Sequence, residues 1–424
     1  MKNDILDIWK EDFLVKTSFI LILFFPVFLL FGSSLINTSI VLLNILFLIH
    51  IYKKKTFKVF NNDIFYFLIA FWVLLIINTL LNDNFENNYS RGFGFIRFIL
   101  LVFSFSYFLS YKNYKFKKII FNFWTIFFII VSLDLIFEYI FGFNTLGFRS
   151  DYNARLSGFM GDELKIGHWY LCFTLLILSN NFTNLKQFYF IVLSSIIISF
   201  LIGERGNFIR LFLALTFLLI ILKKINYKNL TVMFLAVALI TLLVGQNKNK
   251  NLIKERFIND FVGLVTKYDT FKEFNNHNFY TPMYVNAYNI FLENKILGVG
   301  AGSYFKISHE KFRKIKHNHL FQIHFNGYDI LPNTHPHQHH FEILATLGLP
   351  GYLFLLFFFL YFFNKSIRFY LKTPNILNLT SFLFVIIFLI PLLPTGSFFT
   401  TYGATMFWIN FSLMNLGNFK NINY

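Results

Sequence analysis

Residues 341–363 read FEILATLGLPGYLFLLFFFLYFF, and this stretch decides the fold class. Its 23 residues contain a single charged side chain, Glu342. About 20 apolar residues in an α-helix suffice to cross the hydrocarbon layer of a bilayer. Comparable runs recur at residues 18–31, 64–81 and 119–141, and 56% of the 424 residues are hydrophobic. The sequence therefore predicts an all-α protein that crosses a membrane many times.

The apolar runs predict about twelve transmembrane helices. Their expected bounds are residues 17–32, 34–52, 64–81, 94–111, 119–141, 166–180, 187–202, 207–222, 229–245, 341–363, 377–394 and 398–416. Lysines precede the first run, as they do in a signal peptide. No Ala-x-Ala-like cleavage site follows Phe31, however, so we expect a retained first helix.

Basic residues are distributed unevenly between the expected connections. With a cytoplasmic N-terminus, the inner segments contain Lys53, Lys54, Lys55, Lys58, Lys112, Lys115, Lys117, Lys118, Lys223, Lys224, Lys228, Lys365, Arg368 and Lys372. The short outer connections are poorer in lysine, and the turn expected at residues 395–397 has none. The positive-inside rule therefore predicts that both termini of this inner-membrane protein are cytoplasmic.

This orientation places the long hydrophilic stretch 246–340 on the outer side. It is too long for a connector and too rich in aromatic residues for a disordered linker, so we expect a small helical subdomain. The chain then divides into helices one to nine (1–245), a large periplasmic loop (246–340) and helices ten to twelve (341–424). The formal charge of +17 does not indicate nucleic-acid binding, because basic residues punctuate the apolar runs and form no single patch.

Arginine predominates among the basic residues expected on the outer side. They are Arg91, Arg97, Arg149, Arg155, Lys165, Arg205 and Arg210. A guanidinium group binds phosphate oxygens through two parallel hydrogen bonds, so these residues indicate an anionic, lipid-linked ligand. The tight turn at residues 203–207 would hold Arg205 at the membrane edge, beside the amides of a helix N-terminus. The alternative is that each arginine reaches the interface or pairs with Asp134, Glu138 or Glu204.

Eight of the eleven histidines lie between His309 and His340, and the densest cluster reads His335-Pro336-His337-Gln338-His339-His340. Asn333 and Thr334 are expected to cap the following helix, with Pro336 in its first turn. The positive end of the helix dipole would then keep the His337 ring neutral, so that it can accept a proton. Zinc binding by His335, His337 and His339 is one alternative, although no cysteine or carboxylate pattern accompanies them. An interface without chemistry is the other.

The chain resembles the bacterial superfamily of O-antigen ligases and O-antigen polymerases. His337-Gln338, followed after nine residues by Gly348 and then Gly351, is similar to the His-[Asn/Ser/Gln]-x9-Gly-x-x-Gly pattern of the ligases. Three further stretches resemble family motifs in the same order: residues 155–159 (RLSGF), 203–206 (GERG) and 296–300 (ILGVG). The shared core covers about residues 190–352. Many relatives carry an arginine about fifteen residues before the Gly-x-Gly segment, where this chain reads Phe279-Tyr280-Thr281-Pro282.

The resemblance implies a GT-C-like membrane glycosyltransferase with one large periplasmic helical loop. It would move a glycan from undecaprenyl diphosphate to a lipid A–core hydroxyl, with inversion and without a metal or other cofactor. His337 would be the base, and Arg205, helped by Arg155 and Arg210, would hold the diphosphate. His335 and Gln338 would support the base or the acceptor. Arg256, Arg313 or Arg210 would replace the missing arginine.

Two other functions remain open. A polymerase would use the same chemistry but transfer the growing chain to another lipid-linked repeat unit. A transporter for the lipid-linked glycan would need ionisable residues at mid-membrane and related sequence halves. Asp134 and Glu138 lie towards the outer end of the fifth helix, and no related halves are found. The expected partners are thus the donor, the acceptor and membrane lipids, with no nucleic acid.

Overall fold

The computed structural model describes residues 8, 10–82, 85–111, 115–150, 155–161, 163, 165–223, 280–317, 333–391 and 393–419. All regular elements among these residues are helices. The α-helices are α2 (Phe13–Phe28), α3 (Ser33–Lys54), α4 (Asp63–Leu81), α5 (Phe85–Gly92), α6 (Ile96–Ser110), α7 (Lys115–Phe141), α8 (Ile166–Asn180), α9 (Leu185–Ile202), α10 (Arg205–Ile221), α15 (Thr281–Glu293), α16 (Tyr304–His317), α18 (His339–Lys372), α19 (Ile376–Phe388) and α20 (Thr401–Met414). Short 3₁₀ helices are η1 (Phe57–Phe60), η2 (Phe93–Phe95), η3 (Gly158–Met160) and η6 (Leu416–Phe419).

Six of the described helical segments are long and apolar enough to cross a membrane. They are Ser33–Lys54, Asp63–Leu81, Glu86–Ser110, Phe116–Phe141, Leu185–Ile202 and His339–Lys372. Three shorter apolar helices, Phe13–Phe28, Ile166–Asn180 and Ile376–Phe388, lie beside them. Large apolar side chains remain exposed on the outside of the bundle, including Leu133 of α7 at 60% and Leu360 of α18 at 58%. An apolar exterior of this kind is covered by lipid, so the chain is a multi-pass α-helical membrane protein.

Each span that the sequence predicts within the described residues coincides with an α-helix, whereas the span at 229–245 lies outside them. Two boundaries were wrong. The helix predicted at 377–394 ends at Phe388, and α20 begins only at Thr401, so a long non-helical connection replaces the short turn at 395–397. Pro391 and Pro394 lie in this connection, and proline cannot continue a helix because it lacks the amide hydrogen.

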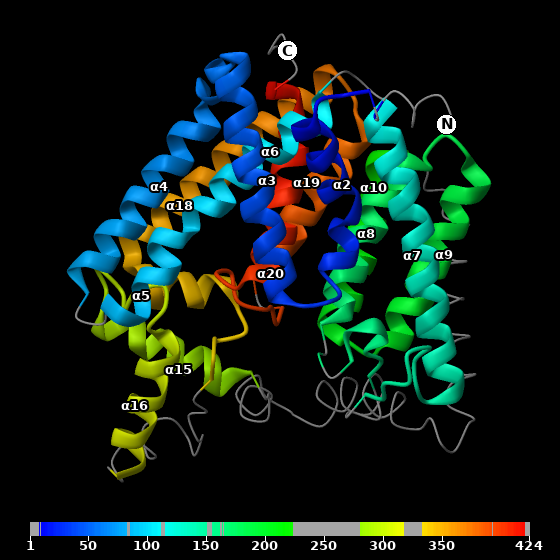
Figure 1. Ribbon diagram of the computed structural model, residues 1–424. Helices are drawn as coiled ribbons and strands as arrows, with labels where there is room; N and C mark the ends of the chain where they lie inside the picture. Colours follow the sequence, from blue (N-terminus) through cyan, green and yellow to red (C-terminus); the bar gives the residue numbers. More distant parts are fainter. Residues whose placement is uncertain are drawn as a thin grey trace.

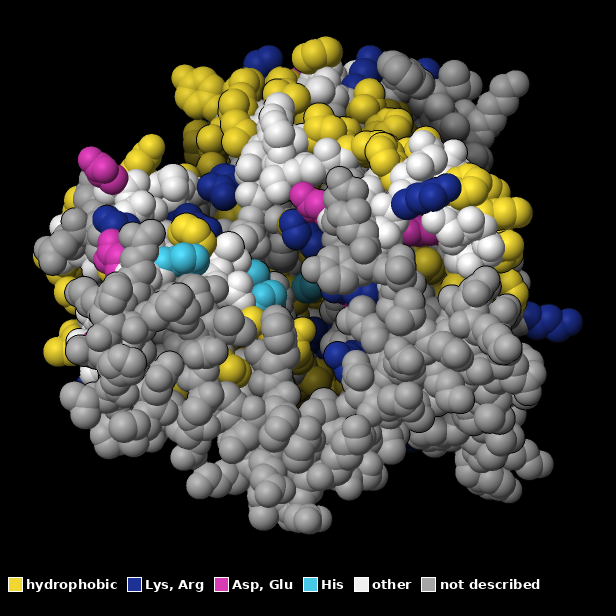
Figure 2. Space-filling view, turned by 90° about the horizontal axis from the view of Figure 1, so that it is seen from below, with side chains coloured by type: hydrophobic (Ala, Val, Ile, Leu, Met, Phe, Trp, Pro, Cys, Tyr) yellow, Lys and Arg dark blue, Asp and Glu magenta, His cyan; other side chains and the backbone are white. Residues whose placement is uncertain are grey.

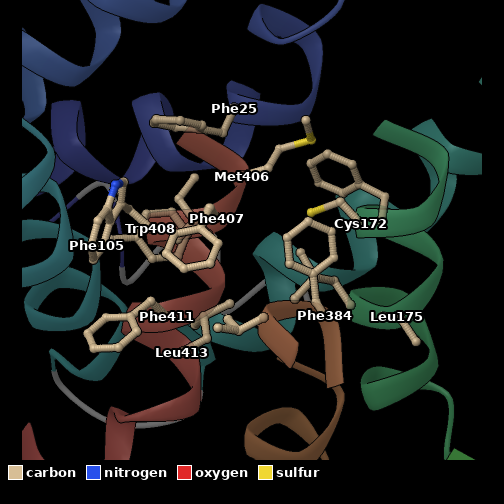
Figure 3. Close-up of a cluster of buried hydrophobic side chains, with 14 of the residues drawn as sticks. Phe25, Phe105, Cys172, Leu175, Phe384, Met406, Phe407, Trp408, Phe411 and Leu413 are labelled. Atoms are coloured by element: carbon tan, nitrogen blue, oxygen red, sulfur yellow. The ribbon is translucent and has the colours of Figure 1, made fainter. Parts of the chain in front are cut away.

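Helix α20 occupies the centre of the bundle, where it packs against α19, α6 and α3. Its residues from Tyr402 to Met414 are all buried. Trp408 contacts Phe407 and Phe411 of its own helix and also Phe95 and Phe358, and Figure 3 shows part of this aromatic core. The beginning of α2 and the end of η6 lie at the same end of the bundle, at the top of Figure 1. Helices α5, α15 and α16 lie at the opposite end.

Helix α18 is interrupted at Gly348, which has φ 68° and ψ −173°. The non-helical residues 295–300 after α15 run alongside this break. The amides of Val299 and Gly300 donate to the carbonyls of Ala345 and Thr346 at 2.9 Å each, and the amide of Leu349 donates to Lys295 at 2.7 Å. Non-helical backbone is tolerated within a membrane protein where other parts of the protein satisfy its polar groups.

The two glycine motifs of the sequence therefore pack against each other. A Cβ atom on Gly348 would lie 2.2 Å from the carbonyl oxygen of Ile296, and one on Gly298 would lie 2.5 Å from that of Thr346. Only glycine permits such close backbone contact. The break in α18 thus lies at Gly348, where residues 295–300 pack against the helix, and Pro350 follows two residues later within the helix.

Candidate active site at the histidine cluster

His337 lies just before helix α18, and the capping residue differs from the prediction. Gln338 is the N-cap, and its side-chain oxygen accepts hydrogen bonds from the amides of His340 at 2.6 Å and Phe341 at 3.1 Å. The expected caps, Asn333 and Thr334, therefore lie outside the helix. The sequence could not rank these capping residues, because each is a good hydrogen-bond acceptor at a helix N-terminus.

The backbone of His337 adopts a left-handed conformation with φ 54°. Its carbonyl oxygen accepts a hydrogen bond from the amide of Thr395 at 2.7 Å. Its ring lies 4.2 Å from that of His335 and 5.7 Å from that of Tyr280, measured between centroids. Thr334 and His335 share a 3.0 Å hydrogen bond between Oγ1 and Nδ1. The tertiary structure thus places His335 and His337 side by side.

Both rings are held in their neutral form. Burial lowers the pKa of His337 below its usual 6.5, and an interaction with the backbone of Thr395 opposes this only in part. The pKa of His335 is lowered further, to about 3, by burial, by the adjacent His337 and by the charges of Arg91 and Lys165. A neutral imidazole at neutral pH is able to accept a proton.

The next two histidines face the helical bundle. His339 is stacked on Phe388 with centroids 4.2 Å apart, and its Nδ1 lies 3.1 Å from the Phe388 carbonyl oxygen. His340 bonds to the hydroxyl of Tyr352 at 3.1 Å and to the carbonyl of Leu389 at 2.8 Å. The rings of His335, His337 and His339 therefore do not converge. Within the part of the chain that the structure describes, no three His, Cys, Asp or Glu side chains form a group that could hold a metal ion.

Arg210 is the most deeply buried of the predicted diphosphate-binding arginines, at 2% exposure. One terminal nitrogen donates to the carbonyl of Leu393 at 3.0 Å and the other to the side chain of Asn207 at 3.4 Å. Its Nε has no hydrogen-bond partner among the described residues. A buried guanidinium with an unused donor is suited to an anionic ligand.

The connection between α19 and α20 joins this arginine to the histidine. Leu393 accepts from Arg210, and Thr395, two residues later, donates to His337. The same connection is anchored by Glu342 of α18, whose carboxylate accepts hydrogen bonds from the hydroxyl of Ser397 and, at 2.7 Å, from the amide of Phe398. The predicted site residues did not include Glu342. Glu342 is the only charged residue in the apolar run 341–363, and this isolated charge could have marked it as a site residue.

Two tyrosines at the start of α15 lie between Arg210 and His337. The rings of Tyr280 and Tyr284 are stacked at 6.3 Å, and Tyr280 also contacts the His337 ring. Burial raises the pKa of Tyr284, and the charge of Arg210 partly opposes that rise. The charge of Arg210 therefore acts on Tyr284, next to residues 279–282, where the resemblance leads us to expect an arginine that this chain lacks.

The other predicted arginines lie nearby in different settings. Arg155 forms a 3.0 Å salt bridge with Glu204, as one alternative reading of the sequence had anticipated. Glu204 is the N-cap residue of α10 and also accepts from the amide of Gly167 at 3.3 Å. Arg205 is the half-buried first residue of α10, beside the amides of that helix N-terminus. Arg256 and the side chain of Arg313 lie outside the described residues.

Figure 2 shows the molecule from the end opposite the beginning of α2. Histidine side chains gather in the middle of this face, and lysine and arginine side chains lie on either side of them. The two groups that the sequence analysis singled out, histidines and arginines, therefore share one end of the bundle.

A comparison with protein families matches residues 190–356 to the family described as O-Antigen ligase. The match includes Arg205, Arg210, Tyr280, His337 and Glu342. No curated protein matches the chain.

Proposed function

The chain belongs to the superfamily of O-antigen ligases and polymerases, and from this premise we propose that it transfers a glycan from undecaprenyl diphosphate to a sugar hydroxyl of lipid A–core. Members of the family are glycosyltransferase-like enzymes, and their substrates are lipid-linked glycans. The proposed reaction takes place on the periplasmic side of the bacterial inner membrane, at the end of the bundle that carries the histidines.

One observation carries this proposal. His337 and Arg210 are distant in sequence, yet they bind residues 395 and 393 of the same connection, with hydrogen bonds of 2.7 Å and 3.0 Å. A neutral ring and a buried guanidinium with an unused donor are thereby held at one site. These are the two groups that an inverting transfer from a diphosphate requires.

In the proposed mechanism, the neutral ring of His337 takes the proton of the acceptor hydroxyl. The hydroxyl oxygen attacks the anomeric carbon, and the bond from that carbon to the diphosphate oxygen breaks with inversion. The electron pair passes to the diphosphate, whose growing negative charge Arg210 and Arg205 stabilise. Arg155 supports this site through its ion pair with Glu204, and His335 lies against the base. The diphosphate is already a good leaving group, so the mechanism needs neither a nucleotide nor a metal ion.

The first experiment replaces the proposed base. His337→Ala should reduce glycan transfer by the purified, reconstituted protein at least about 100-fold, because general-base catalysis typically contributes that much. His309→Ala is the matched control. His309 lies on α16, at the same end of the bundle as His337, and among the described residues it bonds only to the carbonyl of Phe305. Normal transfer by a well-folded His337→Ala protein would disprove the assignment.

A second experiment tests the diphosphate contact. Arg205→Lys keeps the charge but removes the planar, two-point hydrogen-bonding geometry, so transfer should fall about tenfold or more. The matched control is Arg149→Lys, at an exposed arginine in the connection after α7. Equal rates for the two variants would show that two-point phosphate binding by Arg205 is unnecessary.

The acceptor distinguishes a ligase from a polymerase. A deletion strain should produce lipopolysaccharide core without O-chain and accumulate lipid-linked polymer. Core that carries a single repeat unit would instead identify a polymerase with the same chemistry.

A further inference from the structure

A second cluster of arginines lines a separate pocket beside the candidate active site. The pocket has a volume of about 520 Å³ and lies between the beginnings of α3 and α20 and the end of α5. It is lined by Ser33, Asn37, Val41, Ser90, Arg91, Arg97, Phe399, Thr400 and Thr401. Volumes of about 300–1,000 Å³ are typical of small-molecule sites, so this pocket has room for a sugar residue with a charged substituent.

The pocket is positively charged and rich in hydrogen-bonding groups. Arg91 and Arg97 both line it, and the described residues that line it include no carboxylate. Each arginine is oriented by one backbone carbonyl: Arg91 donates to Ala301 and Arg97 to Gly94, at 2.9 Å in both cases. The Arg97 guanidinium also lies over the ring of Phe98, 4.6 Å from its centroid.

Arg97 retains an unused donor, because its Nε has no hydrogen-bond partner among the described residues. The hydroxyl of Thr401 bonds to the side-chain oxygen of Asn37 at 3.3 Å, so these two polar groups are held in position at the wall. Paired guanidinium groups beside hydroxyl and amide groups form a site suited to a phosphate-bearing sugar.

The pocket lies at the other end of the connection that joins Arg210 to His337. Along this connection Leu393 contacts Arg210, Thr395 contacts His337, and Phe399 and Thr400 line the pocket. Figure 1 shows α5 and α10 on opposite sides of α20. The charge of Arg91 also contributes to the lowered pKa of His335, so the pocket is within electrostatic reach of the histidine pair.

We propose that the pocket of Arg91 and Arg97 binds a phosphate-bearing sugar of the acceptor. The inference rests on the proposed function and adds the acceptor's chemical class and place to it. In an inverting displacement, the attacking hydroxyl and the leaving diphosphate lie on opposite sides of the anomeric carbon. Along the connection, the contact of Arg210 comes before that of His337 and the pocket residues come after it, so a second anion-binding site there fits the acceptor and not the donor.

Direct binding provides the first test, and it does not depend on catalysis. The full-length protein is reconstituted in phosphatidylcholine nanodiscs, and the probe is glucose 6-phosphate, with glucose as the uncharged control. Arg91→Gln and Arg97→Gln should each weaken glucose 6-phosphate binding about fivefold or more, whereas Arg149→Gln and Arg205→Gln should leave this binding in place. Unchanged binding in both pocket variants would overturn the proposal.

Replacing Arg91 also removes its hydrogen bond to the carbonyl of Ala301 and so could affect folding. A third pocket variant therefore leaves both arginines in place. Ser33→Trp fills the pocket from an exposed position at the start of α3 without removing an arginine. It should weaken binding of glucose 6-phosphate while leaving the melting temperature unchanged. Full binding in a folded Ser33→Trp protein would place the probe elsewhere and would also overturn the proposal.

Transfer kinetics show whether the pocket binds the acceptor or a lipid headgroup. The pocket variants should raise KM for the acceptor about tenfold and leave KM for the donor within about twofold. If phosphatidylglycerol in the nanodiscs displaces glucose 6-phosphate and acceptor KM is unchanged in the variants, the pocket holds a headgroup and the inference fails. Loss of the proposed function would appear differently, as normal transfer by the His337→Ala protein.

Discussion

At the scale of the residue, His337 combines an unusual backbone with the predicted chemistry. A left-handed conformation costs a residue other than glycine roughly 1–2 kcal/mol, so the surrounding structure must stabilise it. The hydrogen bond from Thr395 contributes to this. The conformation turns the His337 ring towards His335 and Tyr280, whereas His339, two residues later, is stacked inside the bundle.

The pH dependence of transfer should reflect the lowered pKa of His337. A base acts in its neutral form, so the rate should be constant above this pKa and should fall as the pH drops through it. Burial lowers the pKa below its usual 6.5. We therefore expect a half-maximal kcat/KM, which reports the free enzyme, below pH 6.5 in a profile measured from about pH 5 to pH 8. An acidic limb centred above 6.5 would contradict the assignment, provided that the protein remains folded over this range.

At the scale of the element, helix α18 brings the parts of the site together. Its N-terminal half begins beside His337 and supplies Glu342 to the connection before α20. Its break at Gly348 receives residues 295–300, which follow α15, the helix that begins beside Tyr280. The stretch from His337 to Gly351, which resembles the ligase pattern, thus contains both the histidine and the break at Gly348, and residues 295–300 pack against that break.

Gly348→Ala tests this docking. The new Cβ would lie 2.2 Å from a backbone oxygen, and the residue would keep a positive φ, so unfolding should become easier by about 2 kcal/mol or more. Melting in mild detergent measures the change. Gly396→Ala is the matched control, because a Cβ at Gly396 meets no atom within 4 Å. Similar melting temperatures for both variants would mean that the close contact at Gly348 is dispensable.

Glu342→Gln tests the anchoring of the connection. A carboxylate accepts from both Ser397 and Phe398, whereas an amide presents a donor to one of them. We expect kcat to fall about tenfold with little change in donor KM, because the Thr395 contact to His337 loosens while the arginines remain. A variant with an unchanged kcat would argue that Glu342 does not position the base.

At the scale of the whole molecule, the two ends of the bundle differ in charge and chemistry. Lys58 lies just after α3 at one end, whereas the histidines, Arg205 and the pocket of Arg91 and Arg97 lie at the other. The apolar belt between these ends is covered by lipid. We expect the lysine end to face the cytoplasm, as the positive-inside rule predicts.

Cysteine labelling in intact cells tests this orientation. Cys172, the only cysteine, is buried, and its sulfur accepts a hydrogen bond from Asn410 at 3.2 Å, so the background should be unreactive. A membrane-impermeant maleimide should label Arg149→Cys from outside and should label Lys58→Cys only after the membrane is opened. The reverse pattern would place the histidine cluster in the cytoplasm.

The apolar helices were predictable because lipid selects for composition and length over about 20 residues, and neither depends on tertiary contacts. The sequence did not predict the cap at Gln338 or the length of the connection before α20. Asn333, Thr334 and Gln338 compete for the same role, and a proline marks only where a helix cannot continue. The short helix α5, which carries Arg91, was likewise missed because it is polar and only eight residues long.

By itself, the sequence determined that the chain is a multi-pass helical membrane protein whose residues 190–356 match the O-antigen ligase family, because apolar length and motif order are properties of the linear chain. It also singled out His337 and the arginines. Only the tertiary structure decided which of these residues meet. A two-residue interval in one connection brings Arg210 and His337 together, Glu204 pairs with Arg155, and a separate pocket gathers Arg91 and Arg97. Contacts between residues so far apart along the chain depend on how the helices pack, which no local pattern records.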